Sequence, residues 1–169
     1  MAYTYSKIAT YTVGSGGIPS VSFLNIPQNY TDLILKMSAR GANAATFSTM
    51  KISFNGVITS LNSKQLYSDS TVGGSSYTDT SAIQPSANGA SSTANVFSNG
   101  EIYITNYSGY VHKCLSLDNV TENNATGAWK EMFSGLWANT SPITQIDITG
   151  VGNISQYSTF HLYGIRAEI

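Results

Sequence analysis

The sequence is poor in charge, and this shortage excludes whole classes of partner. Charged residues make up 10% of the 169 residues, against about 25% in ordinary soluble domains. The formal net charge is −1, and the eight Lys and Arg residues are scattered along the chain. The sequence therefore lacks the basic footprint that binding to nucleic acid or to an anionic membrane would need. Its polar surface must consist mostly of Ser, Thr, Asn, Gly and Tyr.

Cysteine, histidine and long apolar runs are also scarce. Cys114 is the one cysteine, so no internal disulfide forms, and a metal site would have to use His112 and His161, which lie far apart in the sequence. No apolar run approaches the roughly 20 residues that span a bilayer. The first residues, MAYTYSKIATYTVGSGG, lack a charged stretch followed by an apolar one, so they predict no secretory signal. We expect a protein that is made in a cytoplasm and has no membrane or nucleic acid as its partner.

What the sequence does contain is apolar alternation with a period of two. In residues 32–40 one face carries only apolar residues: Leu33, Leu35, Met37 and Ala39. This period is typical of a half-buried strand. Similar patterns predict further strands at 6–13, 20–26, 51–56, 101–106, 112–120, 143–150 and 158–165, with a weaker one at 63–67.

Residues 129–138 fit two different periods. Their large apolar residues recur at helical spacing, at Trp129, Met132, Phe133, Leu136 and Trp137. Gly135 and the aromatic content favour a strand instead. Because every neighbouring element is a predicted strand, we expect a strand here as well.

Residues 57–100 differ from the rest of the chain. They are rich in Ser, Thr, Asn and Gly and hold three charged residues, Lys64, Asp69 and Asp79. Loops of this length are uncommon unless they are functional or packed against a partner. The composition also fits disorder, but we expect an ordered excursion that Tyr67, Tyr77 and Ile83 hold in place.

The pattern as a whole predicts one all-β domain spanning residues 1–169. Short strands with turn signals every 8–15 residues are typical of a β-sandwich or barrel. The long middle excursion and the lack of predicted helices favour a jelly-roll β-sandwich of about eight or more antiparallel strands.

Catalytic motifs are absent from the sequence. It contains no nucleophile elbow, phosphate-binding loop, zinc-protease motif or paired-cysteine motif. His112 and Cys114 lie two apart on one predicted strand, which we interpret as an exposed imidazole beside a buried thiol. Asp118 and Glu122 have no cleft-spanning carboxylate partner of the kind a glycosidase needs. The stretch NVTENNATGAW, residues 119–129, we interpret as a connector between strands. We expect no enzymatic activity, no cofactor and no metal.

Aromatic residues are the better candidates for a binding site, since the chain holds 11 Tyr and 2 Trp. Three interpretations stay open: they rim the core, they form a protein interface, or they stack on sugar rings. Six of them we single out as candidate interface or glycan contacts: Tyr67, Tyr77, Tyr107, Tyr110, Trp129 and Trp137.

Several stretches, taken in order, resemble a family of short virion-associated proteins and fibre-tip domains of tailed bacteriophages. The most specific is the run Ile-Pro-x-x-Tyr-x-x-Leu, which begins at Ile26 and ends at Leu33. Gly-Leu-Trp at 135–137 and Leu-Tyr-Gly-Ile at 162–165 support it. The similar stretches are 20–41, 51–56, 94–109, 116–148 and 158–165.

The resemblance implies an all-β jelly roll with a structural or adhesive role, as a homotrimer in the virion, and it brings no catalytic residues. No shaft or coiled coil precedes the domain, which favours a capsid decoration (cement) protein bound to the major capsid protein or another virion protein. The alternative is a tail-fibre or receptor-binding adhesin that contacts a host-surface glycan. We expect residues 1–13 or the 57–100 excursion to reach out and dock on the particle.

Overall fold

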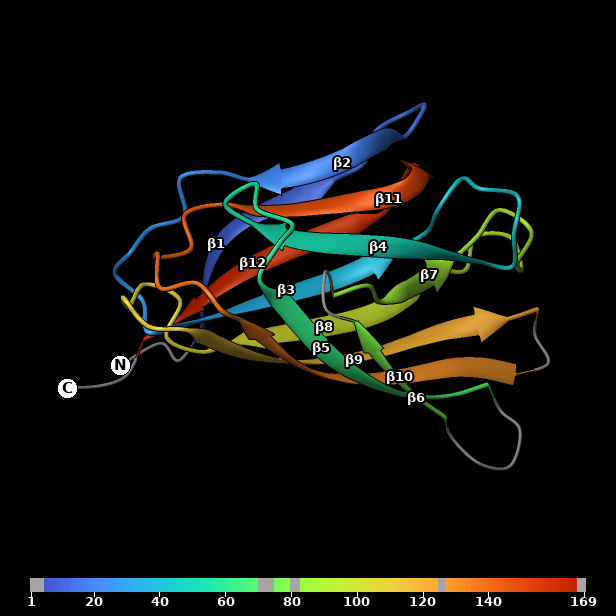
Figure 1. Cartoon of the computed structure of the whole chain (residues 1–169). Helices are drawn as coiled ribbons and strands as arrows, with labels where there is room; N and C mark the ends of the chain where they lie inside the picture. Colours follow the sequence, from blue (N-terminus) through green and yellow to red (C-terminus); the bar gives the residue numbers. More distant parts are fainter. Residues whose placement is uncertain (1–4, 70–74, 80–82, 125–126, 167–169) are drawn as a thin grey trace.

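The computed structural model describes residues 5–69, 75–79, 83–124 and 127–166, which are all-β (Figure 1). Within these residues the chain forms twelve strands. Their bounds are β1 Tyr5–Thr12, β2 Ile18–Phe23, β3 Asp32–Ala39, β4 Phe47–Phe54, β5 Leu61–Ser68, β6 Ser75–Asp79, β7 Ser86–Asn88, β8 Ser98–Ile104, β9 Lys113–Asn123, β10 Gly127–Trp137, β11 Ile146–Ile154 and β12 Thr159–Ile165. No helix long and apolar enough to cross a membrane occurs in this part of the chain.

The strands form two sheets that pack face to face. The large sheet has the order β1-β12-β3-β8-β9-β10-β5-β6, and the small sheet has the order β2-β11-β4-β7. Neighbouring strands run antiparallel in both sheets. In Figure 1 the ribbons of β2, β11 and β4 lie above those of β3, β8, β9 and β10. The all-β, antiparallel part of the prediction is therefore confirmed.

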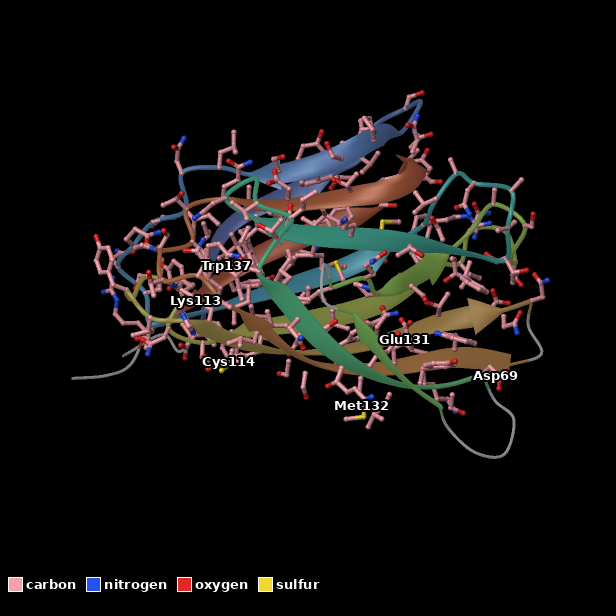
Figure 2. All side chains as sticks on the ribbon, in the orientation of Figure 1. Asp69, Lys113, Cys114, Glu131, Met132 and Trp137 are labelled. Atoms are coloured by element: carbon pink, nitrogen blue, oxygen red, sulfur yellow. The ribbon has the colours of Figure 1, made fainter. Side chains whose placement is uncertain are left out.

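Alternation along each strand decides which face of the large sheet a residue joins. In β9 the odd-numbered residues from Lys113 to Thr121 are buried, and the even-numbered residues from Cys114 to Val120 are exposed. Successive side chains of a strand point to opposite faces, so one face joins the core and the other faces solvent. Figure 2 shows Met132 and Cys114 on the side away from the small sheet, and Trp137 on the side toward it.

The hydrophobic core fills the space between the two sheets. Aliphatic side chains from central strands dominate it and are fully buried, among them Leu33, Leu35, Ile52, Ile102, Ile104, Ile146 and Ile148. Each such side chain stabilises the fold by about 1.5–3 kcal/mol relative to leaving it exposed. The core thus fixes the register of the strands that carry the surface described below.

The strand expected at 129–138 is confirmed, because β10 pairs with β9 and with β5 along its length. Helical spacing of its apolar residues arises because Trp129, Phe133 and Trp137 point inward while Met132 points outward. The connector expected at 119–129 is largely strand as well, since β9 ends at Asn123 and β10 begins at Gly127.

The excursion expected at 57–100 contributes β5, β6 and β7. Two of these strands extend the large sheet beyond β10, and β7 pairs with β4 of the small sheet. Ile83, Ala87 and Asn88 are fully buried. The described part of this Ser/Thr-rich stretch is therefore built into both layers of the fold.

The N-terminal strand does not reach out from the fold. β1 pairs with β12 from Tyr5 to Thr12, with one irregularity between Lys7 and Ala9. The expectation of a free docking arm is wrong for residues 5–12, because ladder hydrogen bonds hold them at the edge of the large sheet.

Tyr30, just before β3, packs directly against β12. The ring of Tyr30 lies so close to Gly164 of β12 that a Cβ atom at Gly164 would overlap Cγ of Tyr30. The glycine is therefore required by the close approach of an aromatic ring rather than by backbone conformation.

Candidate interaction surface

Two of the six candidate contact residues, Tyr107 and Trp137, are fully buried. The Tyr107 hydroxyl donates to Pro27 O, and burial raises the pKa of Tyr107. Trp137 packs against Phe54 with ring centroids 5.5 Å apart. This part of the prediction is corrected: a position near a turn says nothing about which way an aromatic side chain points, and both of these point into the core.

Tyr67 and Trp129 do come together on the structure. Their rings stack with centroids 4.6 Å apart and planes 19° apart. Phe47 stacks on Trp129 in the same way, at 5.7 Å and 15°. We call Tyr67, Trp129 and Phe47 the aromatic row; it joins β5 and β10 of the large sheet to β4 of the small one. Trp129 is the middle ring, and Phe47, 50% exposed, is the more open end.

A buried carboxylate, that of Glu131, holds the middle ring of the aromatic row through a hydrogen bond. Glu131 is 3% exposed, and Trp129 Nε1 donates to its Oε1 at 2.9 Å. Its four other donors are Gln65 Nε2 at 2.6 Å, Ser86 N at 2.8 Å, Ser86 Oγ at 2.9 Å and Asn119 Nδ2 at 2.6 Å. An ionised carboxylate only accepts hydrogen bonds and offers about four lone-pair positions. Five donors occupy them, so Glu131 is committed to holding β5, β7, β9 and β10 together.

On the outer face of the large sheet lies a hollow of about 840 Å³, which we call the outer hollow. Residues of β3, β8, β9, β10 and β5 line it. Its apolar part consists of three exposed aliphatic side chains, Leu66, Val120 and Met132. Leu66 lies opposite Met132 in the β5–β10 ladder, and these two side chains are 56% and 61% exposed. These exposed aliphatic side chains make the outer hollow a candidate interaction surface.

The charges around the outer hollow balance one another. Lys36 Nζ lies 2.9 Å from Glu101 Oε2, and this hydrogen bond raises the pKa of Lys36. Asp118 lies beside Glu101 in the β8–β9 ladder, and Lys130 lies opposite Val120 in the β9–β10 ladder. Two cations and three anions line the hollow, but one of the anions, Glu131, is buried. The two exposed cations and two exposed anions therefore favour neither a strongly acidic nor a strongly basic partner.

A second exposed apolar feature is the Tyr110 loop, residues 105–112, which joins β8 to β9. Tyr110 is 81% exposed and its neighbour Val111 is 48% exposed. The base of the loop is firmly held, since Asn106 N donates to Asp32 Oδ1 at 2.7 Å and Tyr107 is buried. The loop therefore presents Tyr110, another of the candidate residues, from a fixed platform.

The remaining predicted residues do not join these surfaces. Tyr77 belongs to β6, and its side chain lies outside the described residues. Cys114 is exposed, which corrects the expected buried thiol: its neighbours Lys113 and Leu115 point inward, so it must point outward. His112 is exposed as expected.

The two acids singled out in the sequence, Asp118 and Glu122, have different surroundings in the structure. In the described ranges no group of three or more His, Cys, Asp or Glu side chains is placed to hold a metal ion. Glu122 accepts hydrogen bonds from Asn88 Nδ2 at 3.1 Å and Thr93 Oγ1 at 2.5 Å. Asp118 lines the outer hollow instead, so these two acids serve different parts of the fold.

Sequence reasoning missed Leu66, Val120, Met132 and Phe47. One signal was present: Val120 shares its phase in β9 with Cys114, Ser116 and Asp118, so an apolar residue stands among outward-facing positions.

No family model matches the chain, and no curated protein and no solved structure matches it.

Proposed function

We propose that this protein is a non-enzymatic structural protein of a tailed-bacteriophage virion, a homotrimer that decorates the capsid and bridges neighbouring subunits. The observation that carries the proposal is the outer hollow, a concave aliphatic surface with balanced charges that a single chain leaves uncovered. Such a surface suits burial against another protein chain. The bacteriophage resemblance of the sequence adds the kind of particle.

A jelly-roll fold is part of the proposal, and the strand pairing supports it. The pairs β1–β12, β2–β11, β3–β8 and β4–β7 are those of one long antiparallel hairpin folded over on itself. The remaining four strands extend the large sheet past β8, in the order β9-β10-β5-β6. Two double-stranded insertions into a jelly roll give this arrangement.

The outer hollow lies mainly on these added strands. Leu66 belongs to β5, Val120 to β9 and Met132 to β10. The inner side chains of these strands, such as Trp137, join the core, and their outer side chains supply the exposed surface. This position supports a role in assembly.

A trimer bound to three capsid subunits would hold tightly even if each single contact were modest, because the second and third contacts form at high effective concentration. The low charge of the chain, 10% of its residues, fits contacts that rest on apolar area and neutral hydrogen bonds.

The test is the position and copy number of the protein on the particle. Heads purified without the protein are incubated with it and imaged by cryo-electron microscopy. We expect hundreds of copies on a regular lattice of the head and a head that withstands heating better. Density at the tail tip alone, or no binding to heads, would overturn the decoration proposal.

The aromatic row favours a second candidate, an adhesin that contacts a host-surface glycan. Its half-exposed Phe47 ring offers an apolar face on which a sugar ring can stack. A glycan array separates the candidates: sugar binding that Phe47→Ala abolishes would favour the adhesin. Tyr157→Ala, which removes another exposed aromatic ring far from the row in sequence, is the matched control. Head binding that Phe47→Ala leaves intact, with no signal on the array, favours decoration.

A further inference from the structure

We infer that the outer hollow receives the Tyr110 loop of a second copy of this chain, so that copies join head to tail. The inference rests on the homotrimer of the proposed function and names the surfaces that build it. The hollow is concave and aliphatic, and the loop presents Tyr110 and Val111, a highly exposed aromatic side chain and an exposed aliphatic one.

The chemistry of the two surfaces is complementary. Residues 105–112 contain no Asp, Glu, Lys or Arg, so seating the loop buries no unpaired charge, which would otherwise be costly. A tyrosine brings a large apolar ring and one hydroxyl donor. Asp118 lines the hollow on β9, opposite Glu101 of β8 and Met132 of β10. Its carboxylate can accept a hydrogen bond from the Tyr110 hydroxyl.

Hydrogen bonds hold the Tyr110 loop against the rest of the single chain. Ser108 Oγ donates to Tyr30 O at 3.2 Å, and Gly109 N donates to Asn106 O at 3.0 Å. Ile143 N donates to Tyr107 O at 2.8 Å. Docking a preorganised loop loses little conformational entropy, and this is the main way in which rigid surfaces gain affinity.

One chain cannot place its own loop in its own hollow. The loop caps one end of the β8–β9 hairpin, whereas Asp118 lies five strand residues beyond Lys113, a distance of about 17 Å along β9. The contact is therefore between copies and joins two different surfaces. Head-to-tail contacts of this kind close into a ring when the rotation between copies permits, and each copy of a trimer then gives one loop and receives one.

Two single variants test the inference with purified protein. Tyr110→Asp alters the loop and leaves the hollow intact, and Met132→Lys alters the hollow and leaves the loop intact. Both positions are exposed, so we expect unchanged circular dichroism and thermal unfolding. Tyr157→Asp, at another exposed tyrosine, is the matched control. Sedimentation velocity should give trimers for the wild type and for Tyr157→Asp, and monomers for each of the two test variants.

Mixing the two variants is the decisive step. One intact loop and one intact hollow remain, so an equimolar mixture should form heterodimers that contain one copy of each variant. A mixture that stays monomeric, a wild type that is monomeric, or a trimer that survives either single change overturns the inference.

Cross-linking provides a second readout in the Cys114→Ser background. Cysteines introduced by Tyr110→Cys and Met132→Cys in one chain should give disulfide-linked dimers and closed trimers when the thiols are oxidised by dissolved oxygen. Neither product should form when either cysteine is omitted. Equal amounts of cross-linked product from single-cysteine chains would count against the inference.

The two proposals fail separately. A monomer that decorates heads would overturn this inference, and a head-to-tail trimer that does not bind heads would overturn the decoration role.

Discussion

Glu131 and Asn119 lie directly opposite each other on β10 and β9, and Asn119 Nδ2 donates to Glu131 Oε2 at 2.6 Å. The same nitrogen donates to Ser86 O at 2.8 Å, so turning the amide around would set its oxygen against two acceptors. Gly100 makes room for this amide, since a Cβ atom there would lie 2.9 Å from Asn119 Oδ1. The pair ties the added strands to β7 of the small sheet.

Glu131→Gln should destabilise the fold although it keeps the shape of the side chain. A glutamine amide carries N–H donors where the carboxylate has an acceptor oxygen. These donors would face the N–H and O–H groups that now donate to Glu131. We expect the free energy of unfolding to fall by about 1–3 kcal/mol, as measured by urea denaturation. Glu101→Gln, at the exposed ion pair with Lys36, is the control and should change it by about 0–1 kcal/mol. Equal effects of the two changes would contradict the role given to Glu131.

Arg40→Lys should loosen residues 90–96 while the core stays intact. Arg40 donates to four backbone carbonyls of this stretch, of Ala90, Ser92, Thr93 and Val96. One ammonium group cannot reproduce the planar fork of a guanidinium. We expect faster amide hydrogen exchange in residues 90–96 and unchanged exchange in β9. Lys7→Ala, at an exposed cation of β1, is the control and should leave the exchange rates of both segments unchanged. Equal exchange in wild type and Arg40→Lys would show that Arg40 does not hold residues 90–96 in place.

Tyr103 should lose its proton at a higher pH than an ordinary tyrosine, and the free energy of unfolding should therefore fall at alkaline pH. Its hydrogen bond to Asp32 Oδ2, 2.6 Å long, raises the pKa of Tyr103 from 10.0 to about 12. The native state holds this proton more tightly than the unfolded chain, so the stabilisation is present below pH 10 and is lost as the pH rises toward 12.

Ultraviolet absorbance of the phenolate measures this directly. The difference between wild type and Tyr103→Phe should show one tyrosine of the 11 with a midpoint near 12. The stability difference between the two proteins should narrow between pH 10 and pH 12. A midpoint at the ordinary value of 10.0 would show that the Asp32 contact does not hold the proton.

Gly164→Ala should destabilise the protein because its methyl group would overlap the Tyr30 ring. Overpacking of this kind typically reduces the free energy of unfolding by about 1–3 kcal/mol. Gly14→Ala is the control, since nothing lies within 4 Å of a Cβ atom there. Thermal unfolding of the two variants should separate them clearly, and Tyr30→Ala combined with Gly164→Ala should remove the steric part of the effect.

Assembly should survive high salt. The outer hollow and the Tyr110 loop contribute apolar contacts and a net charge near zero, and salt screens such contacts weakly. We expect the proposed trimer and its proposed attachment to heads to persist in about 1 M salt, where ionic contacts between exposed groups are largely screened. Dissociation there would show that ion pairs carry the assembly.

Strand identity was predictable from the sequence wherever one face is buried. In residues 32–40 the Leu33 and Leu35 side chains enter the core as the alternation predicts. Ile34, on the other face of β3, is buried as well. In residues 129–138 the apolar spacing alone fits a helix, and the strand was predicted correctly because the neighbouring segments are strands. The aromatic candidates were less predictable: Tyr107 and Tyr110 stand in one loop, yet one is buried and the other is the most open tyrosine of those described.

The outer hollow was beyond the reach of local patterns. It depends on β10 pairing with β5, which brings Met132 beside Leu66 across 66 residues of chain. The sequence of β5, LNSKQLYS, is mostly polar, and its position is fixed by neighbours rather than by its own apolar period. Pairing between such distant segments follows from the whole fold.

The added strands β9, β10, β5 and β6 have a consequence for how this protein changes over time. In β5, β9 and β10 the outer side chains, such as Leu66 and Met132, contact solvent in the single chain, while inner ones such as Trp137 join the core. Substitutions on the outer side can therefore alter what the protein attaches to without altering what it folds into, so new specificities can arise on an unchanged framework.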